Sequence, residues 1–299
     1  MTRAERIAIR SERVKQRRIK MGLLVDSNVA SNVIESVITT TDTTTTRVKI
    51  SHELPAIIPE GKLSIEICIH TYRYQRRLTF MLSSLLQQKG DVPNLIINIS
   101  HTDNDGDPTT KAVCDFFREK GLNIVETLVT PEEISNRALA RNKQSTATTA
   151  DWILFADSDM VYAEYFFDDL QKRLKTIYKD VQLVMGADRH SLDDQFCIKY
   201  FEEDKTIYPC VIEGVAKKCS DFKLKWITGS GTAAGNFQLI SGKVLKEKCG
   251  GKVTDRPGDF WRRTKGDRAL RIRAGGRQAI KTLNQWHLNH DRGNEFIQR

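Results

Sequence analysis

The stretch that decides the fold is DWILFADSDMVY, residues 151–162. Its first part, Trp152 to Ala156, carries no charge and has the length of a buried strand. Two carboxylates one residue apart, Asp157 and Asp159, follow at once. Because side chains alternate along a strand, residues at this spacing project to the same side. The pattern predicts a buried strand that brings two carboxylates to one edge of a sheet.

Strand-like and helix-like segments alternate before this stretch. Strands are expected at 63–69, 94–100, 122–129 and 152–156, and helices at 78–88, 109–121 (closed by Gly121) and 132–149. Such alternation predicts βαβ units with a mostly parallel sheet and right-handed crossovers. The expected fold is therefore α/β, of the nucleotide-binding type.

Polar residues follow three of these strands, at 70–73, 101–105 and 157–159. Ligands of such sheets bind at the carboxyl ends of the strands, so we expect the three clusters to converge on one rim. Carboxylate oxygens favour Mg²⁺ or Mn²⁺, and such ions usually complete their shell with phosphate and water. The sequence thus predicts a divalent ion first and a phosphorylated ligand second.

A calcium loop or a helix cap could also account for acidic residues at these positions. A calcium loop that starts at Asp157 would need an oxygen ligand and a glycine at positions 161 and 162, which are Val and Tyr. The DNDGD segment at 103–107 has its glycine too early for such a loop and is expected to be a polar turn. Capping of a helix over 163–177 by Ser158 or Asp159 remains an alternative.

Composition limits the class of protein. The 299 residues are 39% hydrophobic and 28% charged, and no apolar run has the length of a membrane span. The apolar run near the N-terminus, 21–25, is too short for a secretory signal, so we expect a cytoplasmic, intracellular protein. The six cysteines are expected to be reduced thiols. Zinc binding by Cys197, Cys210 and Cys219 would not follow a compact ligand spacing.

The net charge of +9 is concentrated at the two ends. Residues 1–20 hold eight Lys/Arg against two Glu, and residues 255–299 hold eleven Lys/Arg against five acids. These ends could attract nucleic acid or an anionic surface, or could act as solvated charge. We expect a basic extension with a helix near 3–23 and a Thr-rich linker over 1–60, followed by a domain over 61–299.

The order of motifs resembles the GT-A glycosyltransferases, in particular the inverting family-2 type with a galactosyltransferase-like C-terminal half. The resemblance rests on four segments: SIEICIHTYRYQRRLTFMLSSLLQQ (64–88), NRALARNKQSTATTADWILFADSDM (136–160), GTAAGNFQLISGKVLKEKCGG (231–251) and GDRALRIRAGG (266–276). It covers about residues 62–292 and implies a donor half over about 61–160 and an acceptor half over 161–299.

The resemblance implies roles for individual residues on the donor side. Thr71, Tyr72, Arg73 and either Asp103 or Asp105 would contact the nucleoside. Arg141 and Asn142 would face the diphosphate. Asp159 would bind Mn²⁺ or Mg²⁺ directly, and Asp157 would contact the ribose or the metal through water. A further metal ligand would be His287, with His290 as the alternative.

The same resemblance implies a donor and a reaction. The donor would be a nucleoside-diphosphate sugar, expected to be a UDP-sugar, and the product would be inverted at the anomeric carbon. Asp267, in the segment that resembles the family's EDxxL motif, would be the general base. Gly266 stands where the family has a further acid, so Asp255 and Asp259 remain alternatives. The glycines of TGSGTAAG, 228–235, would allow close backbone approach, and Trp226 would stack on a sugar or fill the core.

The acceptor is not encoded in a motif that we can decode. The segment 186–226 lies where acceptor specificity is expected, and the basic ends leave a modified base in DNA open beside a saccharide, a lipid-linked glycan or a protein. A sugar nucleotidyltransferase is an alternative enzyme class, but it should have a Gly-rich loop after the first strand, and CIHTYRYQRR has no glycine. A non-catalytic nucleic-acid-binding protein would explain the charge but not the paired carboxylates.

Overall fold

The structure is a computed structural model that describes residues 61–102, 108–131, 133–177, 184–192, 196, 208–222, 224–228, 237–255 and 265–288. All of these residues belong to the unit Leu54–Arg299. The expected extension over 1–60 lies outside the described residues, so its boundary stays a prediction.

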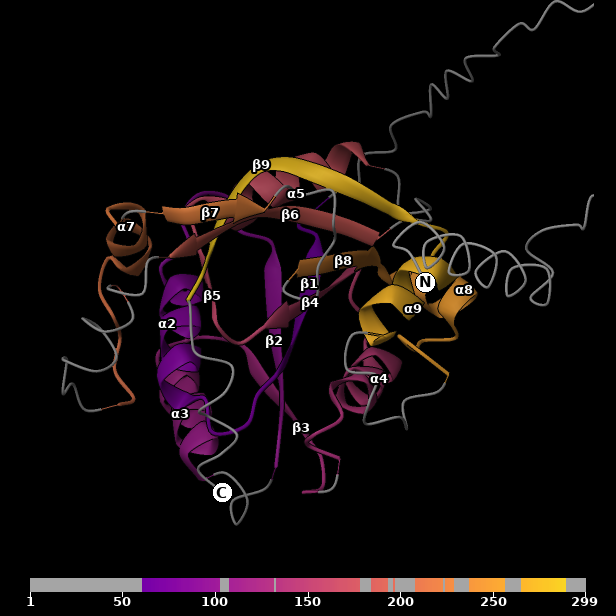
Figure 1. The fold of residues 1–299 in the computed structure, drawn as a ribbon, viewed down its shortest axis with the longest axis horizontal. Helices are drawn as coiled ribbons and strands as arrows, with labels where there is room; N and C mark the ends of the chain where they lie inside the picture. The colour runs from indigo at the N-terminus through magenta and orange to yellow at the C-terminus, as the bar shows by residue number, and fades with distance from the viewer. Residues whose placement is uncertain are drawn as a thin grey trace, which may run out of the picture. The chain divides into compact units, whose positions relative to one another are not determined.

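The first half of the domain is a parallel sheet flanked by helices (Figure 1). It consists of β1 (Ser64–His70), α2 (Gln75–Leu86), β2 (Asn94–His101), α3 (Pro108–Glu119), β3 (Ile124–Leu128), α4 (Arg137–Ala147) and β4 (Trp152–Asp157). β1 pairs in parallel with both β2 and β4, and β2 pairs in parallel with β3. The predicted α/β fold with a parallel sheet is confirmed.

The second half extends this sheet with strands of mixed direction. It consists of β5 (Met160–Tyr162), α5 (Phe166–Thr176), β6 (Val184–Leu192), α7 (Val215–Ser220), β7 (Leu224–Thr228), β8 (Phe237–Ser241), α8 (Gly242–Cys249), α9 (Lys265–Arg273) and β9 (Arg277–His287). The strand order is β3-β2-β1-β4-β8-β6-β9-β5, and β7 pairs with β6. β8 pairs antiparallel with β4, whereas β6 and β9 are parallel.

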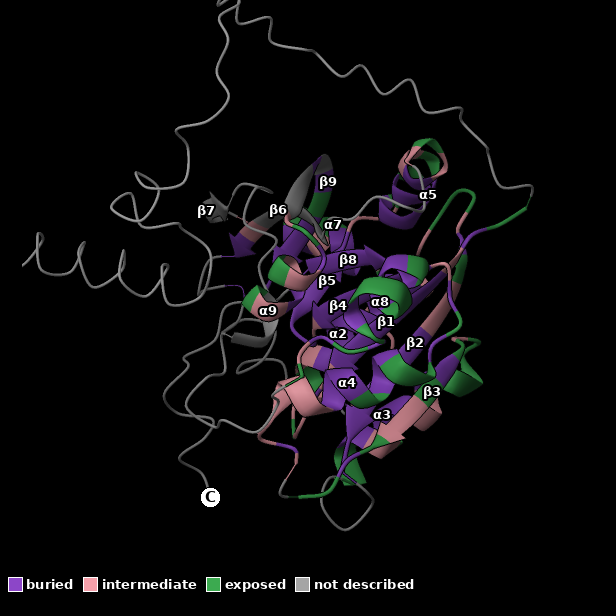
Figure 2. Cartoon of the chain, turned by 90° about the vertical axis from the view of Figure 1, so that its right-hand side faces the viewer, coloured by how far each residue is buried: buried purple, intermediate pink, exposed green. Residues whose placement is uncertain are grey.

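Each face of β4 contributes to a different part of the core. Trp152, Leu154 and Ala156 belong to the cluster that α2 and α3 cover, whereas Ile153 and Phe155 belong to the cluster that α8 and α9 cover. This alternation is the period of two expected for a strand that is buried on both faces. Figure 1 shows α2 and α3 on one side of the sheet and α4, α8 and α9 on the other, and Figure 2 shows the buried residues concentrated between these layers.

Two details differ from the sequence expectations. The helix α4 begins at Arg137 and not near residue 132, because the Asn136 side chain caps it by accepting a hydrogen bond from the Leu139 amide at 3.2 Å. The helix after the acidic pair, α5, begins at Phe166 with Tyr165 as its N-cap residue. Ser158 and Asp159 are therefore not helix caps, and the capping alternative for the acidic pair is wrong.

Candidate active site

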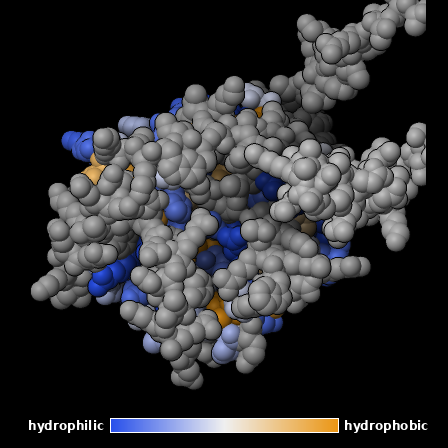
Figure 3. Space-filling model, in the orientation of Figure 1, coloured by the Kyte–Doolittle hydropathy of each residue, from blue (hydrophilic) through white to orange (hydrophobic). Residues whose placement is uncertain are grey.

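The carboxyl ends of β1, β2 and β4 meet at one rim of the sheet. His70 at the end of β1 lies in register with Ser100 of β2 and Asp157 of β4. The Thr71 amide continues this contact by donating to the Ser100 carbonyl at 3.0 Å. Figure 3 shows hydrophilic residues on the surface in the region of β4. The convergence predicted from the parallel order is therefore confirmed for 70–73 and 157–159, while 103–105 lie outside the described residues.

Two arginines of α4 bind the first carboxylate. Asp157 continues the β4 face of Ile153 and Phe155, which is the face toward α4. Its Oδ1 accepts hydrogen bonds from Arg137 at 2.8 Å and from Arg141 at 3.4 Å. Arg141 is buried and lies over the Phe155 ring, 5.5 Å from the ring centroid. Positive charge is thus concentrated beside Asp157, where a diphosphate would need it.

Two amide side chains fix α4 in place. The Gln144 amide donates to the carbonyls of Ile69 (3.1 Å) and Asn98 (2.7 Å), which ties the helix to β1 and β2. The Asn142 amide donates to the Thr254 carbonyl at 2.8 Å, and its oxygen accepts from the Val253 amide at 2.8 Å. Asn142 therefore joins α4 to the segment that follows α8. Because both ends of its side chain have these backbone partners, we do not include it among the proposed donor contacts.

The second carboxylate meets a histidine that is distant in the sequence. Asp159 Oδ2 lies 3.3 Å from Nε2 of His287, and both side chains are largely buried. His287 reaches this position because β5 pairs antiparallel with the end of β9, where Met160 is in register with His287. The Leu288 amide also donates to the Asp159 carbonyl at 2.9 Å. The expected proximity of the DxD segment to the C-terminal part of the domain is thus present for His287, while His290 lies outside the described residues.

This pair is suited to a divalent ion. Adjacent ligands in an octahedral Mg²⁺ shell with bonds of about 2.1 Å are separated by about 3 Å, close to the separation of the Asp159 oxygen and the His287 nitrogen. A carboxylate with an imidazole and open positions suits Mn²⁺ as well as Mg²⁺. Asp157 is already paired with Arg137 and Arg141, so its negative charge is balanced without an ion. The donor set therefore fits a metal held mainly by Asp159 and His287.

The charge of both carboxylates affects a neighbouring tyrosine. Burial raises the pKa of the Tyr162 hydroxyl, and the negative charges of Asp157 and Asp159 raise it further. Tyr162 therefore stays a neutral core residue that packs against Phe166 and Phe167, with ring centroids 4.8 and 5.2 Å away. Asp157 and Asp159 thus lie close to the aromatic core residue Tyr162.

The loop after β1 presents the expected donor-side residues. Thr71 is buried, and Tyr72 packs partly against Val129, Ile134 and Ala140. Arg73 is exposed and adopts a left-handed backbone with φ of 55°, which places its guanidinium 5.0 Å from the centroid of the Tyr72 ring. The left-handed conformation is uncommon for a residue other than glycine and is often found at functional sites.

His70 supports this loop from below. Its Nδ1 and Ser100 Oγ are 3.0 Å apart, and its Nε2 lies 2.8 Å from the Ile134 carbonyl. Burial lowers the pKa of His70 to about 4, and the neighbouring positive charges of Arg137 and Arg141 act in the same direction against the bond to Ile134. The ring is thus neutral at pH 7 and links the ends of β1 and β2 to the segment that precedes α4.

The proposed base is only partly defined. The backbone of α9 includes Asp267, whose side chain lies outside the described residues, as do Asp259, Asp103 and Asp105. Asp255 is described: its side chain is 72% exposed and lies 2.6 Å from Arg273. A solvated, ion-paired carboxylate is a poor setting for a general base, so Asp267 stays our preferred candidate.

Comparison with known proteins identifies the family. The family described as Glycosyl transferase family 2 matches residues 66–212, which include β1 to β4, the acidic pair and both arginines of α4. This chain carries a glycosyl transferase family 2 domain. No curated protein matches the sequence at a significant level.

Solved structures of glycosyltransferases share the fold. TarS 1-349 of S. aureus has a TM-score of 0.50 with 14% identity, and the match covers 76% of this chain and 60% of that one. The mannosyltransferase PcManGT from Pyrobaculum calidifontis, in complex with GDP-Man and Mn²⁺, has a TM-score of 0.44 with 17% identity, covering 78% and 59%. The match covers only 37% of the longer TarS structure. At 14% identity the likeness to TarS 1-349 shows the GT-A fold alone.

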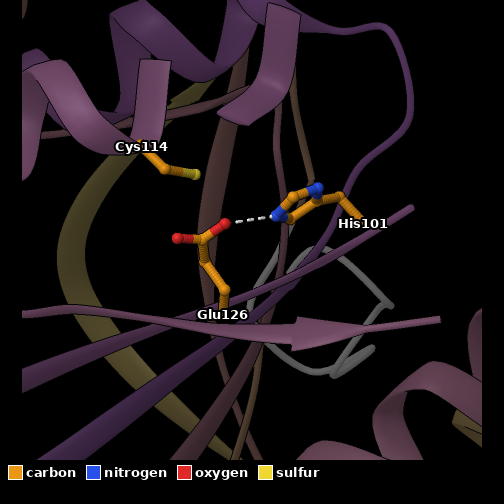
Figure 4. A group of neighbouring side chains, drawn as sticks. All are labelled: His101, Cys114 and Glu126. Atoms are coloured by element: carbon orange, nitrogen blue, oxygen red, sulfur yellow. Dashed lines mark hydrogen bonds and ion pairs between the residues drawn. The ribbon is translucent and has the colours of Figure 1, made fainter. Parts of the chain in front are cut away.

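The domain contains a second polar cluster, formed by His101, Cys114 and Glu126 (Figure 4). His101 Nε2 lies 2.7 Å from Glu126 Oε2, and the Cys114 thiol lies close to both, within a set of atoms that are all within 4.8 Å of one another. Arg118 binds the other Glu126 oxygen at 2.5 Å. Burial opposes ionisation of Glu126, but the bonds from Arg118 and His101 outweigh it and lower its pKa, whereas burial raises the pKa of Cys114 to about 12.

This cluster is better explained as a set of structural contacts between α3, β2 and β3 than as a metal site. Both oxygens of Glu126 already have partners, and the nearby Arg118 would repel a cation. The contacts join α3 to β2 and β3. Among the described residues, Cys68, Cys114 and Cys249 are free thiols, as expected.

One residue of the candidate site, Arg137, was not identified from the sequence. Arg137 lies one helical turn before Arg141, and both reach Asp157. Residues four apart lie on the same face of a helix, so the RALAR spacing contained this signal. In the part of the chain that the structure describes, no helix combines the length and the apolar character needed to cross a membrane.

Proposed function

We propose that this glycosyltransferase is metal-dependent and moves a sugar from a nucleoside-diphosphate sugar to an acceptor hydroxyl, with inversion at the anomeric carbon. The observation that carries the proposal is the 3.3 Å approach of His287 to Asp159, beside an Asp157 that two arginines bind. An isolated acidic pair would repel a diphosphate. A pair with a histidine ligand and two adjacent guanidinium groups can accept both a divalent ion and phosphate oxygens.

The donor would lie across the rim formed by β1, β2 and β4. Thr71, Tyr72 and Arg73 would contact the nucleoside, together with Asp103 from the segment after β2. Arg137 and Arg141 would exchange part of their contact with Asp157 for the diphosphate, since both are already directed to this edge. Asp157 would then be available to the ribose hydroxyls. A uridine nucleotide is our first choice of donor.

The chemistry follows from the charges that develop during transfer. Cleavage at the anomeric carbon builds positive charge on the sugar and negative charge on the departing diphosphate. A divalent ion held by Asp159 and His287 would supply Lewis acidity to the leaving group. Arg141, buried beside Asp157, would add a fixed positive charge there. Asp267 would accept the proton of the attacking hydroxyl, which directs attack from the opposite face and gives inversion.

The acceptor is assigned only to a broad class of hydroxyl compounds. The two acceptors that we propose are a saccharide and a modified base of DNA. A sugar nucleotidyltransferase is less well supported, because the loop after β1 bears Thr71, Tyr72 and Arg73 in place of glycines.

A donor screen tests the proposal. The full chain is incubated with UDP- and GDP-sugars, each with and without Mn²⁺, and thermal unfolding and nucleoside-diphosphate release are followed. We expect one donor to raise the melting temperature only with the metal and to be slowly hydrolysed to free sugar and nucleoside diphosphate. Formation of a sugar phosphate and a nucleoside triphosphate when pyrophosphate is added would instead indicate the nucleotidyltransferase, and no effect of any donor would contradict the proposal.

The role of the base is tested separately. Asp267→Asn should retain metal-dependent donor binding while transfer to an acceptor falls by about a hundredfold or more, as expected for a general base. Asp255→Asn serves as the matched control, because it removes a carboxylate from the exposed pair with Arg273. Equal losses in the two variants would contradict the assignment of Asp267.

A further inference from the structure

The helices α8 and α9 carry basic residues that the proposed reaction, which uses only Asp267 of α9, leaves without a role. We define the α8–α9 face by its charged residues together with Ile272. The basic residues are Lys243, Lys246, Lys248, Lys252, Arg268, Arg271 and Arg273, and the acidic residues are Glu247 and Asp255. Seven basic against two acidic groups give a net charge of +5. Lys265 and Asp267 of α9, whose side chains are not described, would cancel each other.

The face is held together by contacts between the two helices. Val244, Leu245 and Cys249 of α8 share a buried cluster with Leu270 of α9 and with Ala274 just after it. Arg273 donates to the Cys249 carbonyl at 2.6 Å, which joins the ends of the helices. Figure 1 shows α8 and α9 next to one another on one side of the domain. The charges therefore belong to one packed surface and not to two independent helices.

An isoleucine projects from the middle of these charges. Ile272 is 68% exposed, the highest value among the exposed large hydrophobic residues of the described chain. It follows Arg271 and lies four residues after Arg268, so these three side chains occupy the outer side of α9, while Leu270 is buried. An exposed aliphatic side chain surrounded by cationic ones differs from an ordinary solvated surface.

Helix stability accounts for only part of this arrangement. Positive charge in the last turn of a helix interacts favourably with the helix dipole. Four basic residues lie in such turns: Lys246, Lys248, Arg271 and Arg273. The helix dipole does not explain the basic residues at other positions, which are Lys243 at the start of α8, Lys252 beyond its end and Arg268 in the middle of α9. It also gives no reason for the exposure of Ile272.

We propose that the α8–α9 face binds an anionic lipid surface. Basic side chains attract acidic headgroups, and an apolar side chain among them can enter the boundary between headgroups and acyl chains. A nucleic acid would use the same charges, but an aliphatic side chain gains little from a phosphate backbone, and α8 and α9 contain no aromatic residue for base stacking. Ile272 is therefore the feature that favours lipid over nucleic acid.

The residues that define the face differ from those of the metal pair and from the proposed base, Asp267. β9 begins at Arg277, four residues after the end of α9, and ends at His287. The C-terminal end of α9 therefore leads into the start of β9, whereas His287 is its last residue. None of the proposed donor contacts belongs to the α8–α9 face, so substitutions of Lys246, Arg268 and Ile272 should not alter donor binding.

Vesicle binding by the full chain tests this inference. The probe is a pair of sedimented vesicle types, phosphatidylcholine alone and equal parts of phosphatidylcholine and phosphatidylglycerol. We expect binding to the mixed vesicles only. Lys246→Glu with Arg268→Glu should weaken it about 25-fold, about fivefold for each basic residue removed. Ile272→Ser should weaken it by about tenfold through the lost apolar contact.

Matched variants and a second ligand separate the possible outcomes. Lys120→Glu with Lys217→Glu changes the net charge equally at exposed positions outside the face and should leave binding within about twofold of the wild type. Ile272→Ser should leave the affinity for duplex DNA unchanged. Equal losses in the two charge variants, no effect of Ile272→Ser on vesicles, or no binding to mixed vesicles would overturn the inference. Circular dichroism confirms that each variant is folded.

Discussion

The Asn142 side chain provides a quantitative test of how the two halves of the domain are joined. The sequence resemblance places this residue at the diphosphate, whereas in the structure its amide bonds the backbone of Val253 and Thr254. Asn142→Ala would leave the buried Val253 amide and the Thr254 carbonyl without these partners. At about 1 to 3 kcal/mol for each abandoned group, we expect a loss of about 3 kcal/mol in the free energy of unfolding.

The assay is thermal and urea unfolding of the full chain. A loss of this size lowers the melting temperature of a domain of this length by about 6 to 12 °C. Lys143→Ala is the control on the same helix, because it removes only a surface ion pair with Glu133 and should cost less than about 1 kcal/mol. If Asn142→Ala matched this control in stability but lost donor affinity, our reasoning would be refuted and the diphosphate role would hold.

Three further predictions concern single residues. The pKa of His70 is about 4 in the folded protein against 6.5 in the unfolded chain, so its contribution is fully present above pH 6.5 and is lost as the pH falls toward 4. Urea unfolding should therefore show that the stability advantage of the wild type over His70→Asn, as a free energy of unfolding, is smaller at pH 4 than at pH 7 by up to about 3 kcal/mol. Arg137→Ala should weaken donor binding about tenfold in calorimetry, since it removes a charge-assisted contact beside Asp157, and unchanged affinity would contradict this role. Glu126→Gln should lower the free energy of unfolding in urea by about 2 kcal/mol, because it weakens a charge-assisted pair. Excess chelator should not change the stability of the wild type. A large chelator effect that disappears in Cys114→Ser would instead identify a metal site at this cluster.

The first half of the fold could be predicted because its signals are local. Four strands and three helices alternate with short connections, and hydrophobic runs identify each strand. Gly121 adopts φ of 101° after α3, as the sequence indicated for a helix end. The start of α4 was placed five residues too early, because hydrophobic periodicity continues through Ile134 while the chain is still in a turn stabilised by Thr130 and Glu133.

The second half depends on contacts that local patterns do not encode. β8 inserts between β4 and β6, although it follows both in the sequence. β5 pairs with β9, which brings Met160 beside His287, more than a hundred residues later in the chain. The proximity of His287 to Asp159 was expected from a family resemblance and not from periodicity. The partners of Asn142 could not be inferred, since a polar residue on a helix can face either a ligand or a neighbouring backbone.

The most direct test of the account is metal-dependent donor turnover in a variant of the second carboxylate. Mn²⁺-dependent release of nucleoside diphosphate is measured for the wild type, Asp159→Ala and Asp169→Ala, the last being an exposed acid of α5 that serves as the matched control. We predict that Asp159→Ala abolishes the release, that Asp169→Ala retains it, and that excess chelator reduces the wild type to the level of Asp159→Ala. Full release by Asp159→Ala, or by the wild type in chelator, would contradict a metal-dependent transfer at this site.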